Sequence, residues 1–274
     1  MEKDTIIVSM TTWPPRAEHA IMAMRSLVAQ EHSEPVHFVL VLSKDEWNVD
    51  SEDYRANPTD VLNAMEHFGV EVIWDNGNIM SHKKLIPTLE HYPDNPILVV
   101  DDDVLQDSGW LQAFIDEQKT YPTDIIYGHS SSRVSIIHGK ICEGVSQRGV
   151  YTFPGRRTYN EKPANGAAGT LYPSGTFKDE RFFDRKLFMQ LCPTSDETWQ
   201  WAWCVMTGKT YRCLPCCNHP APIGKGEYAL FRTNITKYTQ YHNAIAEMFP
   251  EYKEELAKLI EANPRKYELK YEEL

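Results

Sequence analysis

Long apolar runs are missing from this sequence, in which no stretch reaches the roughly 18 residues that a membrane-spanning helix needs. The N-terminal residues Met1 to Asp4 lead straight into an apolar segment, without the apolar core of a signal peptide. We therefore expect a soluble, cytoplasmic protein with no transmembrane segment, with peripheral association at a membrane as the alternative. Internal repeats, low-complexity tracts and a clear linker are also missing, which favours one domain over residues 1–274.

Positive charge is scarce as well. The chain contains 28 Lys and Arg against 39 Asp and Glu, a formal net charge of −11. Such a balance disfavours phosphate-rich partners, so we expect no binding to nucleic acid and none, broadly, to anionic membranes. Residues 128–165 are an exception, with two glutamates, Glu143 and Glu161, against six basic residues: Arg133, Lys140, Arg148, Arg156, Arg157 and Lys162. This basic segment is either a solvated loop or a site for an anionic group, such as an anionic acceptor.

Cysteine is infrequent, and no export signal points to disulfides, so the six cysteines are most simply reduced thiols. Cys213 and Cys216 have metal-like spacing, and Cys217 and His219 follow closely. A structural zinc would also require a fourth ligand and a tight knuckle, so buried thiols are the simpler interpretation.

Short apolar segments alternate with helical patterns through the first hundred residues. The apolar segments predict strands at residues 5–10, 36–42, 70–74 and 97–100, and the spacing between them predicts helices at 16–30, 59–68 and 83–91. This alternation is typical of a parallel sheet with crossover helices, which binds ligands at the carboxyl ends of its strands. Later patterns predict helices at 109–119, 195–207 and 238–271, the last interrupted at Pro250, with strands at 124–129 and 134–137.

Three carboxylates, Asp101 to Asp103, follow the apolar strand Ile97 to Val100 directly. Side chains alternate along an extended backbone, so Asp101 and Asp103 point to one side and Asp102 to the other. The first and third can therefore share one ion, and oxygen-only ligands suit Mg²⁺ or Mn²⁺ together with phosphate oxygens. The alternative is a solvent-exposed turn, in which nothing would offset the repulsion among three like charges beside a buried strand.

Five motifs in sequence order carry a resemblance to a known family. They are VSMTTWPPR, DNGN followed by KKLIP, VVDDDV, GAAGTLYP and SDETW. Over roughly Ile6 to Val205 the chain resembles nucleotide-sugar glycosyltransferases of the GT-A fold, particularly bacterial enzymes of polysaccharide or lipopolysaccharide synthesis. The resemblance implies a single α/β, Rossmann-like domain with a mostly parallel central sheet, flanking helices and a C-terminal helical extension. It also implies a nucleotide-binding half at about 1–105, an acceptor half at about 106–235 and C-terminal helices at 236–274.

The resemblance also assigns roles to residues. Asp101 to Asp103 match the DXD motif, in which Asp101 and Asp103 hold a metal and Asp102 belongs to the diphosphate site. Thr11, Arg16 and Asp75 match positions that line the base and ribose pocket. Lys84 matches a basic position near the nucleotide. His219 corresponds to the late metal ligand of some members, although the cysteine-rich sequence around it departs from the family pattern.

Glycosyl transfer requires a neutralised diphosphate leaving group and an acceptor hydroxyl made nucleophilic. The expected cofactor, Mn²⁺ or Mg²⁺, would act as a Lewis acid on the diphosphate of a UDP-sugar. A carboxylate serves as general base in an inverting reaction, and Asp196 is the first candidate, with Glu197 second. The expected partners are thus a nucleotide-sugar donor and a saccharide or glycoconjugate acceptor.

Each assignment has a structural alternative. The first turn of a helix favours acids such as Asp196 and Glu197, with Ser195 as the cap. Arg16 can simply open a helix, and Asp75 can form an Asx turn with Gly77. The two lysines of the KKLIP motif, Lys83 and Lys84, can be surface charges. Three alternate tryptophans suggest sugar stacking: Trp199, Trp201 and Trp203. They cannot all share one helix face, so one or two at most should meet substrate.

Rival functions are weaker. Haloacid-dehalogenase-like phosphatases also place a DXD after an apolar strand, but with Thr or Val four residues after the first Asp, where this chain has Leu105. Nucleotidyltransferases bind nucleotide and metal through acids, yet no glycine-rich phosphate loop follows the first strand. A binding module with an inactive site is the non-enzymatic alternative, and the presence of both metal acids and a candidate base argues against it.

Overall fold

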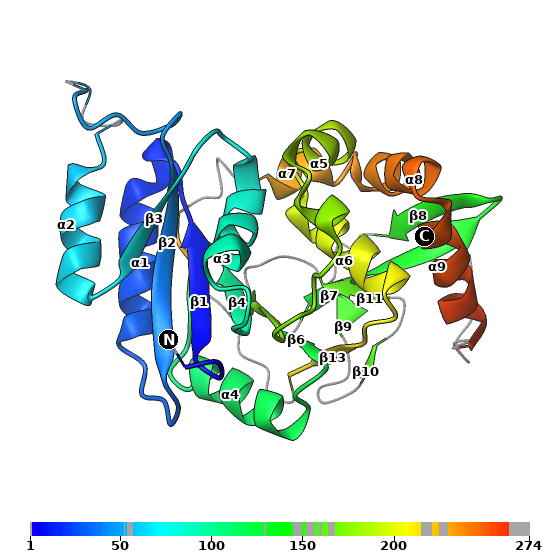
Figure 1. The fold of residues 1–274 in the computed structure, drawn as a ribbon, viewed down its shortest axis with the longest axis horizontal. Helices are drawn as coiled ribbons and strands as arrows, with labels where there is room; N and C mark the ends of the chain where they lie inside the picture. The colour runs from blue at the N-terminus through cyan, green and yellow to red at the C-terminus, as the bar shows by residue number, and fades with distance from the viewer. Residues whose placement is uncertain are drawn as a thin grey trace.

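The computed structural model describes residues 2–51, 53, 57–128, 130–144, 150–151, 157–158, 161–163, 168–214, 221–224 and 230–262. Its centre is an eight-stranded sheet (Figure 1). The strands, in spatial order, are β10 (Arg157–Thr158), β13 (Tyr211–Cys213), β6 (Ile125–Tyr127), β12 (Thr170–Tyr172), β4 (Ile97–Val100), β1 (Ile6–Thr11), β2 (Val36–Ser43) and β3 (Glu71–Asp75). Four of the seven neighbouring pairs are parallel, so the sheet is mostly parallel, as the sequence predicts.

Alternation along the central strands sends apolar side chains to two cores, one on each face of the sheet. In β1, Ile7 belongs to one core and Val8 to the other. The core on the Val8 side is covered by α1 (Ala17–Val28), α2 (Thr59–Phe68) and α4 (Trp110–Thr120). The opposite core is covered by α3 (Ile86–His91), α5 (Arg185–Leu191), α6 (Asp196–Met206), α8 (Tyr238–Met248) and α9 (Pro250–Ala262). Burial on both faces explains why the parallel strands read as continuous apolar runs.

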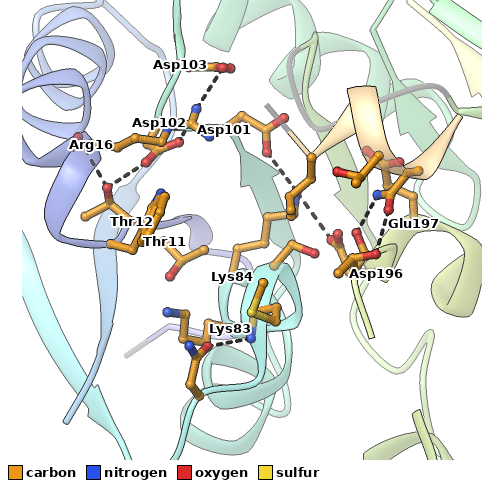
Figure 2. Close-up of a pocket in the computed structure, with 18 of the residues that line it drawn as sticks. Thr11, Thr12, Arg16, Lys83, Lys84, Asp101, Asp102, Asp103, Asp196 and Glu197 are labelled. Atoms are coloured by element: carbon orange, nitrogen blue, oxygen red, sulfur yellow. Dashed lines mark hydrogen bonds and ion pairs between the residues drawn. The ribbon is translucent and has the colours of Figure 1, made fainter. Parts of the chain in front are cut away.

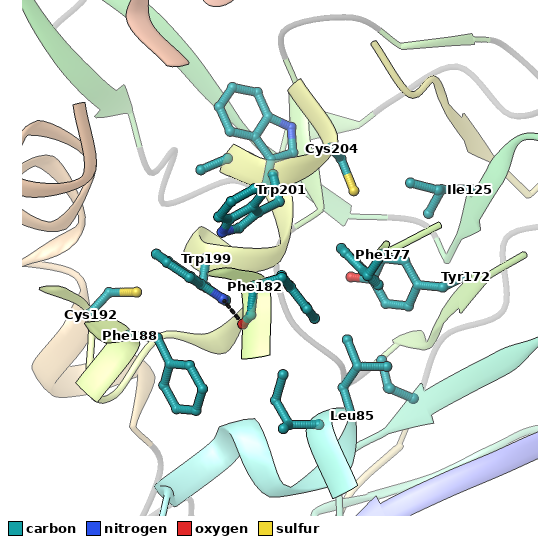
Figure 3. Packing of buried hydrophobic residues seen from close by; sticks show 14 of the residues in the cluster. Leu85, Ile125, Tyr172, Phe177, Phe182, Phe188, Cys192, Trp199, Trp201 and Cys204 are labelled. Atoms are coloured by element: carbon teal, nitrogen blue, oxygen red, sulfur yellow. Dashed lines mark hydrogen bonds between the residues drawn. The ribbon is translucent and has the colours of Figure 1, made fainter. Parts of the chain in front are cut away.

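The larger aromatic side chains gather in the core beneath α6 (Figure 3). Trp199 donates its indole N–H to the Phe182 carbonyl at 3.0 Å, and the rings of Phe177 and Phe182 stack at 4.0 Å. Trp199, Trp201 and Trp203 are all buried, and none of them lines the cleft described below. The three tryptophans therefore pack as core residues, and α6 reaches the cleft through Asp196 and Glu197 in its first turn, so the cleft gives no support to sugar stacking on these rings.

A second, antiparallel sheet packs beside α8. It contains β11 (Glu161–Pro163), β7 (Ser130–Ile137) and β8 (Lys140–Gly144), and β9 (Val150–Tyr151) also pairs with β7. A third, two-stranded sheet joins β5 (Val104–Leu105) to β14 (Ala221–Pro222). The 3-10 helices η1 (Pro14–Arg16), η2 (Met80–Lys84) and η4 (Glu180–Phe183) and the short α7 (Phe231–Asn234) complete the described elements.

Within the described residues, the helices follow the sequence patterns except at two places, and residues 263–271 of the last predicted helix lie outside the described residues. The pattern at 83–91 divides into η2 and α3, because Pro87 opens the second helix. Ser195 precedes α6 as expected, but its hydroxyl bonds the Thr198 hydroxyl at 2.8 Å instead of capping a backbone N–H. In the part of the chain described here, none of the helices combines the length and apolarity needed to span a bilayer.

Candidate active site

A cleft of about 710 Å³ opens where β1 and β4 end, between these strands and the helices α6 and α7. This volume lies in the range of ligand pockets, about 300–1,000 Å³. Asp101 to Asp103 lie on one side and Asp196 and Glu197 on the other, with Lys84 between them (Figure 2). Other lining residues include Thr11, Thr12, Trp13, Arg16, Glu46, Asn78, Lys83, Thr194, Arg232, Asn234 and Tyr238.

Two residues that follow β1, Thr12 and Arg16, contact the acid triplet. Asp102 is buried, accepts a hydrogen bond from the Thr12 hydroxyl at 2.6 Å and forms an ion pair with Arg16, whose Nη2 lies 2.6 Å from Asp102 Oδ1. The same Arg16 nitrogen lies 2.8 Å from Asp103 Oδ2, so one guanidinium bridges two carboxylates. Burial raises the pKa of Asp102 to about 7, against the lowering effects of Arg16 and Thr12. The arrangement places Asp102 inward, while the Asp101 and Asp103 side chains remain 27% and 24% exposed at the rim.

Lys84 connects the two sides of the cleft. Its Nζ donates to Asp101 Oδ1 at 2.8 Å and lies 3.3 Å from Asp196 Oδ2. Burial alone would lower the pKa of Lys84, but these two carboxylates raise it above its ordinary value. Lys83 is buried as well, against Glu46. Both lysines are therefore interior cations, and their interpretation as ordinary surface charges is wrong.

The two acids of α6 have different surroundings. Asp196 is buried, with Lys84 beside it and the Gln200 amide donating to its Oδ2 at 3.1 Å. Burial would raise the pKa of Asp196, but Lys84 and neighbouring donors lower it below its ordinary value. Glu197 keeps 18% of its side chain exposed, 3.8 Å from Lys162 Nζ. Burial raises the pKa of Glu197 to about 7, with the charge of Asp196 adding to the effect and Lys162 opposing it.

Of the other two predicted nucleotide residues, Thr11 lines the cleft and Asp75 does not. Thr11 lines the cleft, with its hydroxyl donating to the Val41 carbonyl at 2.8 Å. Asp75 ends β3 as expected, but it is not among the residues that line the cleft. Its two carboxylate oxygens both accept from Arg185 Nη1, each at 2.8 Å, and Arg185 in turn reaches Glu90 at 2.9 Å.

The predicted late metal ligand, His219, lies outside the described residues, as do Cys216 and Cys217. Cys213 is buried, and its thiol donates to the Gly128 carbonyl at 3.0 Å. Within the ranges that the structure describes, no group of three or more His, Cys, Asp or Glu side chains is arranged to hold a metal ion. The described residues that follow this segment include β14, where the Ile223 N–H donates to the Asp103 carbonyl at 2.8 Å.

Sequence reasoning missed several lining residues. Glu46 follows the end of β2, and the Asn78 amide donates to it at 2.8 Å. The rule that ligands bind beyond strand ends could have identified both. The lining residues around α7 could not be identified in this way. The Thr194 hydroxyl donates to Asn234 Oδ1 at 2.6 Å, a contact between distant segments that only the tertiary fold creates.

The strand order and the position of the cleft define a GT-A-like α/β domain, as the sequence motifs predict. No protein-family model matches the sequence, and no curated protein matches it at a significant level. Among solved structures, residues 1–349 of S. aureus TarS superpose with a TM-score of 0.55 at 13% identity, covering 95% of this chain and 73% of that one. The same TarS segment in complex with UDP gives a TM-score of 0.52 at 12% identity, covering 97% and 76%. A longer TarS chain also gives 0.52 at 12% identity, covering 90% of this chain and 43% of that one. At these identities the likeness defines the fold.

Proposed function

We propose that this protein is a metal-dependent glycosyltransferase that moves a sugar from a nucleotide-diphosphate sugar, UDP-sugars first, to a hydroxyl of a saccharide or glycoconjugate. One observation carries the proposal. Lys84 lies between Asp101 at 2.8 Å and Asp196 at 3.3 Å, so the candidate diphosphate site and the candidate base site face each other across one side chain. The similar fold of a TarS segment solved with UDP supports the choice of nucleotide.

The residues of the triplet fit a divalent ion. Asp101 and Asp103 each give one oxygen to a cation, Lys84 and Arg16 respectively, and both carboxylates reach the rim. Mg²⁺ and Mn²⁺ are commonly held by one or two carboxylates, with phosphate oxygens and water completing the shell. Such a site needs only one or two acidic side chains from the protein, so it does not require the group of three ligands that the described residues lack. When bound, the ion would supply Lewis-acid charge to the diphosphate.

The surrounding side chains then have defined tasks. Arg16 and Thr12 hold Asp102 inward, so that Asp101 and Asp103 stay directed toward the cleft. The Lys84 ammonium adds positive charge on the side where the leaving diphosphate gains negative charge, which favours the transition state. Thr11, with Glu46, Asn78 and Lys83 deeper along the strand ends, supplies polar groups for the base and ribose.

For the general base the geometry favours Glu197 over Asp196, reversing the order that the sequence suggested. Asp196 is engaged by Lys84 and Gln200, and its side chain is only 4% exposed. Glu197 lines the cleft with accessible oxygens, and its pKa of about 7 suits transfer of a proton from an acceptor hydroxyl near neutral pH. The acceptor would then lie toward the α7 wall, near Arg232 and Tyr238.

The proposal is tested without knowledge of the acceptor. Nucleotide sugars are first screened by thermal shift with Mn²⁺, because a ligand that binds the folded state raises the melting temperature. Slow hydrolysis of the donor that stabilises the protein is then measured with Mn²⁺ and with EDTA. We expect Mn²⁺-dependent hydrolysis that Asp103→Ala abolishes and that the control Asp107→Ala, an exposed acid four residues further along, leaves unchanged. Tight nucleotide binding without turnover of any donor would instead indicate an inactive binding module.

A further inference from the structure

A buried cluster of charged groups lies directly behind Glu197. Lys162, on β11, has 1% of its side chain exposed, and Glu143, on β8, also has 1%. Lys162 Nζ lies 3.2 Å from Glu143 Oε1 and 3.8 Å from Glu197 Oε2. The ammonium also lies 4.8 Å from the centre of the Tyr238 ring. It is thus enclosed by two carboxylates and an aromatic face.

The cluster continues away from the cleft. His242 Nε2 lies 2.8 Å from Glu143 Oε2, and the Tyr252 hydroxyl lies 2.7 Å from His242 Nδ1. Burial lowers the pKa of His242 below its ordinary value, so a neutral ring that donates from Nε2 and accepts from Tyr252 satisfies both contacts. Ser132, directly opposite Lys162 in the β11–β7 pairing, donates to Glu143.

Glu143 is therefore fixed as a carboxylate. Burial opposes its charge, but Lys162, His242 and Ser132 together lower the pKa of Glu143 to about 2. Burial would lower the pKa of Lys162, but Glu143 and Glu197 raise it above its ordinary value. Isolated charges are costly in a protein interior, so a buried ammonium and carboxylate of this kind are retained only as a pair. Of the two carboxylates in this cluster, Glu197 lines the cleft and Glu143 does not.

We propose that Lys162 is a positioning residue for Glu197, and that Glu143, held by His242 and Tyr252, fixes the Lys162 ammonium for this task. The inference rests on the proposed function only in taking Glu197 as the base. Lys162 holds the carboxylate toward the acceptor side of the cleft. Glu143 offsets much of the lysine's charge, so that Lys162 does not prevent the Glu197 carboxylate from accepting a proton at neutral pH.

Other charged groups also face Glu197. Asp196 adjoins it on α6, Lys84 approaches from η2, Asp101 from the end of β4 and the Tyr238 hydroxyl from α8. All of them stay unchanged when Lys162 or Glu143 is substituted. The two substitutions remove charges of opposite sign, so they should move the Glu197 titration in opposite directions.

The experiment is a direct titration of Glu197 by carbon-13 NMR in the full-length protein with labelled glutamate, the signal being assigned by its loss in Glu197→Gln. Lys162→Met should raise the midpoint by about one pH unit or more, because an opposite charge within about 4 Å is removed. Glu143→Gln, which keeps the shape of the side chain and one acceptor oxygen but removes its charge, should lower it. Lys162→Arg should restore most of the wild-type midpoint, and Lys186→Met, an exposed lysine on α5, should not change it.

Opposite shifts from Lys162→Met and Glu143→Gln support the proposal, and an unchanged midpoint in both overturns it. If Lys162→Met does not fold, the downward shift in Glu143→Gln and the near-wild-type midpoint of Lys162→Arg decide the question. The acidic limb of the pH profile of Mn²⁺-dependent donor hydrolysis should move with the NMR midpoint, with UDP affinity unchanged. A wild-type protein that turns over no donor would refute the proposed function, while the NMR midpoints would still decide the role of Lys162.

Discussion

The two walls of the cleft balance charge in different ways. On the triplet wall, Arg16 alone is shared by Asp102 and Asp103, so carboxylates outnumber cations. On the α6 wall, each acid faces a lysine: Lys84, which also pairs with Asp101, lies beside Asp196, and Lys162, which also pairs with Glu143, lies beside Glu197. Excess negative charge on the first wall suits a divalent ion, whereas a lysine beside each acid on the second suits the control of one proton. The difference indicates that donor binding and proton transfer can be separated by mutation.

Glu197→Gln should give the largest loss on the α6 wall. Removing a positioned general base typically costs about 10²- to 10⁴-fold in rate, so donor turnover should fall by that order while UDP affinity stays the same. Asp196→Asn should mainly weaken folding, because Lys84 loses one buried partner. Steady-state kinetics and calorimetry on both variants check this. Full activity in Glu197→Gln, with a stable but inactive Asp196→Asn, would assign the base to Asp196.

Lys84→Met tests the connection between the walls. It leaves Asp101 and the buried Asp196 without their shared cation, so the free energy of unfolding should fall by about 3–5 kcal/mol. Urea denaturation measures the change, with Lys253→Met, an exposed lysine on α9, as the matched control. Equal stability of the two variants would mean that Lys84 does not balance the two carboxylates.

Asp103→Asn tests the triplet wall. If Asp103 holds the metal as proposed, its loss should weaken Mn²⁺-dependent UDP binding at least as much as losing an outer-shell partner does, roughly 10- to 100-fold. Binding in EDTA should change little, and Asp107→Asn should behave as wild type in both conditions. Calorimetry with and without Mn²⁺ provides both values. A loss of UDP affinity that is equal in EDTA would point to a metal-free role for the carboxylate.

The pH dependence of stability should show the smallest effect. The pKa of Glu197 is raised from 4.5 to about 7 by folding, so the folded state holds this proton more tightly than the unfolded chain does. The resulting stabilisation is complete below about pH 4.5 and is lost as the pH rises through 7. We expect the free energy of unfolding of the wild type to fall by on the order of 1 kcal/mol across this interval because of Glu197, and we expect Glu197→Gln to lack this fall. Urea denaturation at several pH values measures both. Parallel curves for the wild type and the variant would contradict the raised pKa.

The N-terminal half of the fold could be predicted from the sequence because its signals are local. The strands β1, β2 and β4 contain apolar runs buried on both faces, and the edge strand β3 is partly buried. Each of the four agrees with its predicted segment to within one or two residues. The other half could not be predicted in the same way. Strands of two or three residues, such as β9 and β12, are too short to show periodicity. The antiparallel insertion of β12 between β4 and β6 is set by tertiary packing.

The site shows the same division. Asp101 to Asp103 and the acids of α6 were identified because each set is contiguous in sequence. The partners that set their charges come from distant segments, and a single sequence does not encode such proximity locally. Asp75 and Arg185 are separated by 110 positions, and Glu143 meets His242 across 99. Lys162 looked like part of a basic, solvated segment, but it is buried because Glu143 and Glu197 neutralise it.

The short pairing of β14 with β5 has a consequence for the order in which the site is built. Ile223 N–H binds the Asp103 carbonyl at 2.8 Å, so the backbone of the acid triplet is secured by a residue synthesised long after it. A chain still emerging from the ribosome can complete β1 to β4 and yet lack this clamp. The backbone of the acid triplet is therefore secured late in synthesis, after the acids of α6 already exist.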